Sequence, residues 1–278
     1  MSDKPILVIG GTGKTGRRVA ARLAKQGQPP RIGSRTGTPP FDWHDDSTWP
    51  SAVTGVEAAY VSYYPDLAFP GAAEAIASFA KTAIAGGVRQ IVLLSGRGEP
   101  EAVPSEDAVR NSGAEWTVIR ASWFMQNFSE HFLLGPVLDG VIAMPAGTVG
   151  EPFVDADDVA DVAVAALSED EAGHAGQTYE LTGPRLLTFA DAADELTRAT
   201  GRRISYLPVT PEEYAREAVA AGVPAEEAEP LAELFARVLD GHNAHLTGDV
   251  ERVLGRAPRD FADYVRVAAA TGVWAGVR

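Results

Sequence analysis

Three glycines near the start of the sequence have the spacing of a turn that binds phosphate groups. Gly10, Gly13 and Gly16 follow the apolar run Ile6–Ile9 and precede a segment, 17–25, whose apolar residues recur at helical spacing. Glycine permits a positive φ, lets the backbone approach a pyrophosphate, and lets the helix pack closely on the strand. The free N–H groups at the start of a helix favour an anion. The residues of this turn predicted to bind a dinucleotide are Gly10, Thr12, Gly13, Lys14, Thr15 and Gly16.

The segment after the second predicted strand bears on which dinucleotide would bind. An acidic residue there would accept hydrogen bonds from the ribose of NAD, but 31–35 contains none and the next acid is Asp42. Arg35 can instead pair with a 2′-phosphate through its planar guanidinium, assisted by Ser34. This favours NADP(H) over NAD(H). The alternative is that Arg35 is a solvated surface arginine.

Polar side chains follow two later strands, where a ligand crevice is expected. In a parallel sheet the carboxyl ends of the strands line that crevice. Tyr63 and Tyr64 follow the predicted strand 58–62 and could stack on a ring or donate a hydrogen bond. Ser95 follows the strand 88–94 and could bond to the carbonyl of a substrate. The alternatives are tyrosines packed under the next helix and an ordinary strand-end serine.

An aromatic stretch in the middle of the chain is suited to a flat ligand. Aromatic and thioether side chains offer a wide apolar surface, and an amide among them must find hydrogen-bond partners. A nearby histidine could donate a proton. Ordinary core packing, and a surface position for the histidine, are the alternatives. The residues concerned are Trp123, Phe124, Met125, Asn127 and Phe128, with His131 as the candidate proton donor.

The acid–base pair of typical short-chain reductases is absent from the sequence. That pair is Tyr-x-x-x-Lys, in which the lysine lowers the pKa of the tyrosine that protonates the substrate. None of the four lysines, at 4, 14, 25 and 81, lies four residues after a tyrosine. A reduction would therefore need another proton source, or a substrate that needs none. Hydride delivery to a cationic carbon is such a case, because proximity and orientation supply most of the acceleration.

These residues are expected on a Rossmann-type doubly wound parallel sheet, so the fold class is α/β. Short buried strands alternate with helices, and this alternation implies crossover connections with helices on both faces. A short third strand is expected just before Asp42. The other strands are predicted at 6–9, 58–62, 88–94 and 116–120, with helices at 17–25, 72–85 and 107–112.

The second half of the chain is expected to be smaller and mostly helical. Thr188 is predicted to cap a helix, although Asp191 stands where a capping box calls for Glu or Gln. The chain is divided into a dinucleotide-binding part, 1–150, and a substrate-covering part, 151–278, interleaved with the first. Helices are predicted at 154–167, 188–200, 211–222, 224–239 and 258–271, and strands at 178–182 and 204–208.

The composition narrows the classes of partner. The 278 residues include no cysteine, which excludes disulfides, thiolate nucleophiles and cysteine-ligated clusters. The formal charge of -14 opposes direct nucleic-acid binding. No apolar run suits a signal peptide or a membrane span, so a cytoplasmic protein with a small-molecule substrate and no membrane contact is expected. His242 and His245 have no further ligands beside them, and no metal site is expected.

The sequence resembles the NmrA-like branch of the atypical short-chain dehydrogenases/reductases over nearly its whole length. The resemblance rests on the glycine turn, on Ser34-Arg35, on the segment 93–96 and above all on 123–128, which reads Trp-Phe-Met-Gln-Asn-Phe. The residues around 41–43 and 48–50 are nearer still to bacterial relatives of fungal ergot-alkaloid reductases. Some members of this family are NAD(P)H-dependent reductases. Others bind the dinucleotide without turnover and report redox state to a partner.

The resemblance implies positions for several residues around the cofactor. Ser62 and Tyr63 would flank the nicotinamide ribose, and Ser95 is counted with them among the cofactor-binding residues. Asp42 would accept a hydrogen bond from the adenine amino group, and Trp43 would pack on the adenine ring. The alternative for the last two is an aspartate in a turn and a tryptophan in the core.

One departure from the family bears on the chemistry. Many of its reductases carry a lysine about three residues before the glutamate that corresponds to Glu106, where this sequence has Val103. This disfavours proton transfer assisted by a lysine. The function expected is hydride transfer from NADPH to a small, flat electrophile of quinone, iminium or enone type. The alternative is a non-catalytic, NAD(P)-binding redox sensor acting through a protein partner, and a homodimer is also left open.

Overall fold

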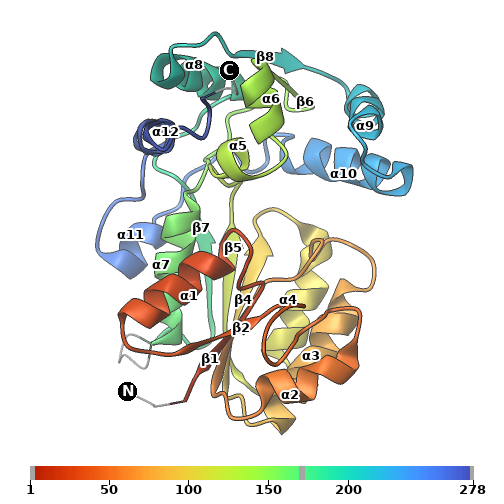
Figure 1. Cartoon of the computed structure of the whole chain (residues 1–278), viewed down its shortest axis with the longest axis vertical. Helices are drawn as coiled ribbons and strands as arrows, with labels where there is room; N and C mark the ends of the chain where they lie inside the picture. The colour runs from red at the N-terminus through yellow and green to blue at the C-terminus, as the bar shows by residue number, and fades with distance from the viewer. Residues whose placement is uncertain (1–3, 169–172, 276–278) are drawn as a thin grey trace. The chain divides into compact units, whose positions relative to one another are not determined.

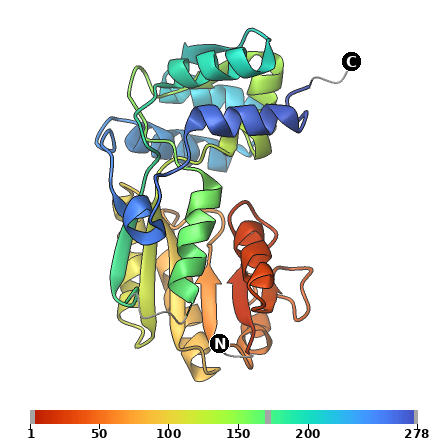
Figure 2. The same cartoon turned by 90° about the vertical axis from the view of Figure 1, so that its left-hand side faces the viewer.

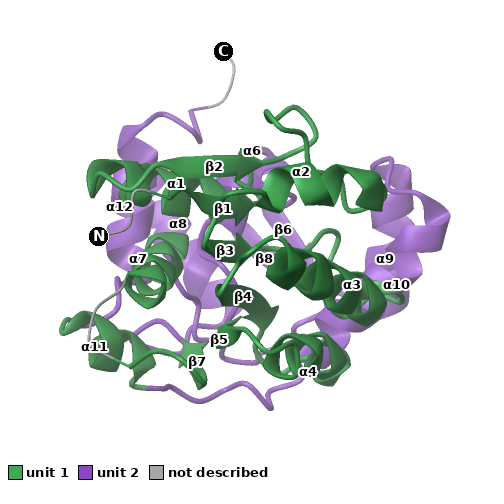
Figure 3. Ribbon diagram, turned by 90° about the horizontal axis from the view of Figure 1, so that it is seen from below, with its two compact units in different colours: residues 1–121, 156–181, 248–256 green, residues 122–155, 182–247, 257–278 purple. Residues whose placement is uncertain are grey.

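The computed structural model describes residues 4–168 and 173–275 (Figure 1). Its contacts group the chain into two compact units, each assembled from three segments (Figure 3). Unit 1 comprises 1–121, 156–181 and 248–256, and unit 2 comprises 122–155, 182–247 and 257–278. The chain therefore passes between the units repeatedly, and these bounds differ from the single division predicted at residue 150.

Unit 1 is built on a six-stranded sheet in which all neighbouring strands are parallel. The order across the sheet is β2-β1-β3-β4-β5-β7. The central strands β1 and β3 are entirely buried, as expected for a parallel sheet covered on both faces. The predicted α/β class is confirmed. The strands are β1 (Ile6–Ile9), β2 (Pro30–Gly33), β3 (Ala58–Val61), β4 (Gln90–Gly96), β5 (Glu115–Ala121) and β7 (Gln177–Leu181).

Helices cover both faces of this sheet. On the face seen in Figure 2, α7 packs against both α1 and α11. On the opposite face, α3 packs between α2 and α4 over a core of apolar side chains from the strands. The helices of the first face are α1 (Gly16–Lys25), α7 (Ala156–Leu167) and α11 (Asp249–Leu254). Those of the second are α2 (Trp49–Val53), α3 (Ala72–Ala85) and α4 (Val103–Arg110), with 3-10 turns η1 (Asp46–Thr48) and η2 (Pro100–Ala102) before α2 and α4.

The predicted short third strand does not form. Asp42 makes only an isolated antiparallel bridge with Asp45. The residues just before it, Pro39 and Pro40, have no N–H group to offer a strand ladder. The chain turns back instead, and the amide of Phe41 bonds to a carbonyl seven residues earlier at 2.9 Å.

One helix start and one helix cap bear on their predictions. α4 begins at Val103 and not at residue 107, because Pro104 occupies the first turn, where its missing N–H group is tolerated. The predicted capping of α8 (Phe189–Thr200) by Thr188 is confirmed, and the capping box is complete although its acid is an aspartate. The amide of Asp191 donates to Oγ1 of Thr188 at 3.0 Å, and the amide of Thr188 donates to Oδ2 of Asp191 at 2.9 Å.

Unit 2 is mostly helical, as predicted, and contains a parallel pair of strands, β6 and β8. Its core is rich in aromatic rings, among which Phe128, Phe153, Phe189 and Phe261 are all buried and in mutual contact. Within 4–168 and 173–275, no helix is both long and apolar enough to cross a membrane. The elements are α5 (Asn127–Glu130), α6 (Leu134–Asp139), β6 (Val141–Met144), α8 (Phe189–Thr200), β8 (Ser205–Pro208), α9 (Pro211–Ala220), α10 (Ala225–Val238) and α12 (Phe261–Ala270).

Candidate functional site

The glycine turn joins β1 to α1 and depends on the absence of side chains. Gly10 has a φ of 70°, and its amide donates to the carbonyl of Gly33 on β2 at 3.0 Å. The amide of Gly13 closes the turn by donating to the carbonyl of Gly10 at 2.8 Å. A Cβ atom on Gly16 would lie 2.2 Å from that same carbonyl oxygen. No other residue type fits there, so the turn brings the start of α1 directly against β1.

A pocket of about 360 Å³ opens beside this turn in unit 1. It lies where β1 has β2 on one side and β3 on the other, which is the point at which the order of the strands reverses and at which α/β sheets bind ligands. The predicted residues that line it are Gly10, Thr12, Gly13, Ser34, Arg35, Asp42, Trp43, Ser62 and Tyr64. The structure thus brings together predicted residues that follow the ends of β1, β2 and β3.

Arg35 stands in this pocket without a partner. Its side chain is exposed and has no hydrogen bond or ion pair with any residue in 4–168 and 173–275. Arg31, four residues earlier, differs, because its Nη1 donates to the carbonyls of Ala52 at 2.9 Å and Thr54 at 2.6 Å. Arg35 is therefore available to an anion, whereas Arg31 holds the end of α2.

Asp42 and Trp43 each have a structural contact, as the alternative interpretation expects, and each also lines the pocket, as an adenine-binding role requires. Oδ1 of Asp42 accepts the amide of His44 at 3.0 Å, as an aspartate in a turn does, yet the residue also lines the pocket. The indole of Trp43 packs edge-on against the buried rings of Phe41 and Phe79, and it too lines the pocket. Both residues are half-buried, so each has one side in the fold and one side open to a ligand.

The two tyrosines after β3 point to different surroundings. Tyr63 is half-buried against the indole of Trp43, with ring centroids 4.9 Å apart. Burial and the nearby Glu74 carboxylate raise the pKa of the Tyr63 hydroxyl. Tyr64 is 71% exposed and lines the pocket. Tyr64 is thus open to a ligand, while Tyr63 keeps its proton and packs on the pocket wall.

Ser95 ends β4 but its hydroxyl is already engaged. Oγ of Ser95 donates to Oε1 of Glu106 at 2.8 Å, and both residues are buried. Glu106 also accepts from Nε and Nη2 of Arg120 at 2.9 and 2.8 Å and from Nη2 of Arg110 at 2.8 Å. Burial alone would raise the pKa of Glu106, but these hydrogen bonds and charges hold it below its ordinary value. The Ser95 proton is therefore already bound to an anionic carboxylate, and a substrate carbonyl would have to compete with Glu106 for it.

The hydroxyl of Thr15 is also used inside the fold. It accepts a hydrogen bond from the hydroxyl of Tyr60 at 2.9 Å, and both residues are buried. Burial raises the pKa of Tyr60, so that hydroxyl stays protonated. The Thr15 side chain thus lies inside the fold, and Thr15 does not line the pocket. Lys14 and Gly16 likewise do not line the pocket.

The predicted substrate residues belong to unit 2, and the structure separates them into two groups. Met125 and Phe128 have no exposed surface and pack in the core, which supports the alternative of ordinary packing for these two. Trp123 and Phe124 are half-buried, and Asn127 is 8% exposed. The indole Nε1 of Trp123 is buried without a hydrogen-bond partner among the residues described. His131 follows α5 and is exposed, the surface position given as its alternative.

Sequence reasoning missed several residues at the strand ends. Thr36 and His44 line the pocket beside Arg35, and nothing in their spacing distinguishes them from ordinary loop residues. Asp66, which follows β3, forms a side-chain hydrogen bond with Glu99, which follows β4. Burial raises the pKa of Asp66, an effect partly opposed by hydrogen bonds from the Ala68 amide and from Glu99. In the described part of the chain, no group of histidines and acids is arranged to hold a metal ion.

The fold and pocket define a Rossmann-type nucleotide-binding α/β protein. Comparison of its sequence with known proteins narrows the family. The chain is 33% identical to the oxidoreductase YesF of Bacillus subtilis, over 99% of both chains. It is 32% identical to the agroclavine dehydrogenase of Claviceps fusiformis, over 94% of this chain and 96% of that one. It is 31% identical to the NAD(P)H azoreductase of Xenophilus azovorans, over 95% and 98%. No protein-family model matches the chain.

Solved structures agree in fold. The triphenylmethane reductase of Citrobacter, solved with NADP(H), superimposes with a TM-score of 0.74 over 95% of this chain and 99% of that one, at 23% identity. NmrA, a negative transcriptional regulator solved with NAD, gives a TM-score of 0.72 over 99% and 100%, at 16% identity. The chain belongs to the NmrA-like branch of the atypical short-chain dehydrogenases/reductases, and it is one of the oxidoreductases of that branch.

Proposed function

We propose that the chain reduces a small, flat electrophile with hydride from NADPH. The observation that carries the proposal is the pocket at the ends of β1, β2 and β3, where Arg35 is exposed and unpaired among the residues described. An arginine with Ser34 beside it suits the 2′-phosphate that distinguishes NADPH from NADH. NADP(H) is also the cofactor of a similar reductase of known structure, and NAD(P)H that of the azoreductase relative.

The backbone of the glycine turn fits the rest of the dinucleotide. Gly10 and Gly13 line the pocket without side chains, and Gly16 lets the start of α1 lie close to β1, so that free amides and the helix dipole can stabilise a pyrophosphate. Trp43 and Asp42 offer a ring and a carboxylate to an adenine. The nicotinamide, when bound, supplies the hydride. The protein supplies binding, orientation and exclusion of water.

The substrate class is inferred from the relatives and from the acid–base groups present. Relatives and similar structures include an agroclavine dehydrogenase, an azoreductase, a triphenylmethane reductase and a quinone oxidoreductase. Azo compounds, triphenylmethane dyes and quinones are all conjugated acceptors, and azo compounds and quinones are flat. The half-buried Trp123 and Phe124 of unit 2 offer such a molecule an apolar surface.

A quinone or an enone must gain a proton as well as a hydride, whereas an iminium needs only the hydride. The candidate proton donors at the strand ends are the hydroxyls of Tyr63 and Tyr64 and the carboxyl of Asp66, whose pKa burial raises. Each follows β3, one of the strands whose carboxyl ends line the crevice of such a sheet. We assign the proton transfer to this group of side chains, in place of the missing Tyr-x-x-x-Lys pair.

The experiment is a turnover panel with purified protein. Loss of NADPH absorbance is followed with quinones, azo dyes, a cationic triphenylmethane dye, cyclic iminium ions and enones. Turnover with at least one class is expected, and NADPH should support it better than NADH. Silence across the panel, although NADPH binds, would contradict the proposal.

The second candidate is a redox sensor without turnover. It is favoured by the absence of Tyr-x-x-x-Lys and by the engagement of the Ser95 hydroxyl with Glu106. Such a protein binds NADP⁺ and NADPH with different affinities and transmits the difference to a protein partner. Calorimetry with both forms tests it, because equal affinities would leave nothing to transmit.

A further inference from the structure

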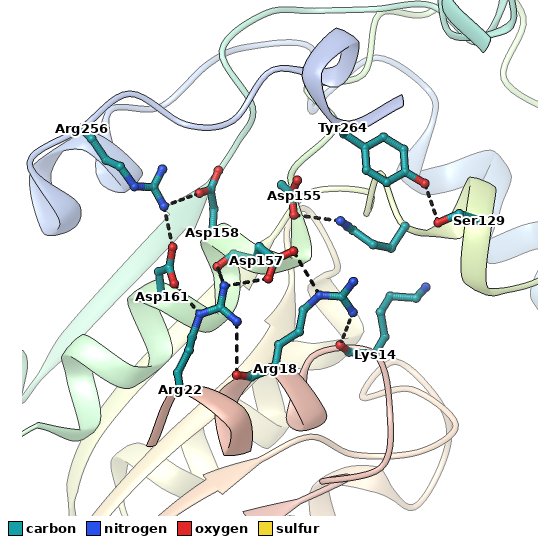
Figure 4. A network of polar contacts seen from close by, with 11 residues as sticks. Lys14, Arg18, Arg22, Ser129, Asp155, Asp157, Asp158, Asp161, Arg256 and Tyr264 are labelled. Carbon is teal, nitrogen blue, oxygen red and sulfur yellow. Dashed lines mark hydrogen bonds and ion pairs between the residues drawn. The ribbon is translucent and has the colours of Figure 1, made fainter. Parts of the chain in front are cut away.

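Arg18 connects the glycine turn to a helix on the same face of unit 1. Its Nη1 donates to the carbonyl oxygen of Lys14 at 2.8 Å, and its Nε lies 3.3 Å from Oδ2 of Asp157 in the first turn of α7 (Figure 4). The Arg18 side chain is only 15% exposed. One planar group therefore binds the backbone of the turn on one side and a carboxylate on the other.

Asp157, the carboxylate that binds Arg18, is also bound by Arg22. Oδ1 of Asp157 accepts from Nη2 of Arg22 at 2.6 Å, and Arg22 also pairs with Asp161 (Figure 4). Burial alone would raise the pKa of Asp157, but the two arginines hold it below its ordinary value. Asp157 is therefore anionic at neutral pH, and Arg18 is kept in place whether or not a ligand is present.

The bond to the Lys14 carbonyl fixes the direction of the next amide. A trans peptide is planar, so its C=O and N–H groups point in opposite directions. With the carbonyl of Lys14 turned toward Arg18, the N–H group of Thr15 points away from it. Among the residues described, this N–H has no acceptor, as is usual just before a helix. The Thr15 side chain is fixed as well, by the hydroxyl of Tyr60 at 2.9 Å.

We infer that Arg18 is a positioning residue for the pyrophosphate, which it serves by holding the Lys14–Thr15 peptide so that the Thr15 amide faces the anion. The inference rests on the proposed function, since it needs a dinucleotide at the glycine turn. Arg18 itself does not line the pocket. Its effect is transmitted through one peptide group, and it concerns the part of the cofactor that NADPH and NADH share.

The test compares Arg18→Met with the unmodified protein by calorimetry. Three probes are titrated: NADPH, NADH, and 2′-AMP, which has the adenosine and the 2′-phosphate but no pyrophosphate. A misplaced hydrogen bond to a charged group weakens binding by roughly tenfold or more. NADPH and NADH are expected to weaken by that same factor, and 2′-AMP is expected to bind as before.

The matched control is Arg22→Met. Arg22 also joins α1 to α7 and is a second partner of Asp157, but it leaves both bonds of Arg18 in place, so this variant should lose stability and weaken dinucleotide binding far less than Arg18→Met. Equal weakening by Arg22→Met, unchanged dinucleotide binding by Arg18→Met, or an equal loss for 2′-AMP would each overturn the inference. Should Arg18→Met fail to fold, Asp157→Asn is expected to give the same pattern with a smaller loss, and unchanged binding there would also overturn it. Failure of the unmodified protein to bind any dinucleotide would overturn the proposed function instead.

Discussion

The hydroxyl of Ser95 donates a hydrogen bond across 2.8 Å to a carboxylate oxygen of Glu106 that is also bound by Arg120. The guanidinium keeps Glu106 anionic, and the anion keeps the proton of Ser95 turned toward itself. Ser95 can therefore accept a hydrogen bond from a ligand while its own proton is occupied. Its position at the end of β4 predicts a donor to a substrate carbonyl, whereas the hydrogen bond to Glu106 leaves Ser95 as an acceptor.

Replacing Ser95 with alanine is expected to cost stability more than turnover. Loss of one hydrogen bond to a carboxylate that keeps three others lowers the free energy of unfolding by about 1 kcal/mol. A donor to the developing charge of a substrate would instead be worth about a hundredfold in rate. Urea denaturation and steady-state kinetics measure the two effects. A hundredfold loss of kcat at unchanged stability would restore the role as donor to the substrate.

Glu106 is expected to make the free energy of unfolding fall as the pH is lowered. Its folded pKa lies below the unfolded value of about 4.3, so its contribution is complete above that pH and is lost as the pH falls through the folded pKa. Glu106→Gln leaves Arg110 and Arg120 facing a neutral group and is expected to lower the free energy of unfolding by about 3 kcal/mol at neutral pH. Chemical denaturation from about pH 7 to about pH 3 should show the two proteins converging in acid. A constant difference would contradict this account.

Arg35→Ala is expected to reduce cofactor discrimination. Losing a charged hydrogen bond to the 2′-phosphate weakens NADPH binding by about 1–3 kcal/mol and leaves NADH nearly unchanged. Arg31→Ala is the matched control, because Arg31 binds two carbonyls at the end of α2 and should affect stability alone. Calorimetric titration of both cofactors decides, and equal losses for NADPH and NADH would refute the 2′-phosphate assignment.

Gly16→Ala is expected to abolish tight dinucleotide binding. Its Cβ would lie 2.2 Å from the Gly10 carbonyl oxygen, so the start of α1 must move away from β1, at a cost of about 1–3 kcal/mol in stability. Gly135→Ala, where a Cβ meets nothing within 4 Å, should leave both stability and binding intact. Thermal unfolding with and without NADPH measures the difference. A normal thermal shift in Gly16→Ala would mean that the turn does not hold the cofactor as proposed.

The glycine turn and the pocket beside it are predicted well from the sequence because their signals are local. A run of apolar residues, three glycines and a helical pattern lie within twenty consecutive residues, and each constrains the backbone directly. The pocket gathers Ser34, Arg35 and Ser62 because carboxyl ends of neighbouring parallel strands meet at one edge. This follows from topology once the strands are recognised.

The predictions that depend on distant partners were less successful. Nothing near Ser95 in the sequence indicates that its hydroxyl donates a hydrogen bond to a buried glutamate eleven residues later. Met125 and Phe128 have the composition of a ligand wall, but composition does not distinguish a wall from a core. The prolines before Asp42 did carry a usable signal, since two residues without N–H groups argue against a strand.

The interleaving of the two units limits how such a protein can diversify. The chain changes unit at 121/122, 155/156, 181/182, 247/248 and 256/257. A single genetic crossover between two relatives therefore cannot exchange one whole unit for another, since any one breakpoint leaves each unit partly from each parent. Neither unit can be produced by trimming one end of the gene. Under the proposed function, new substrate preferences would more easily arise through individual replacements within segments 122–155 and 182–247, with the nucleotide-binding framework inherited intact.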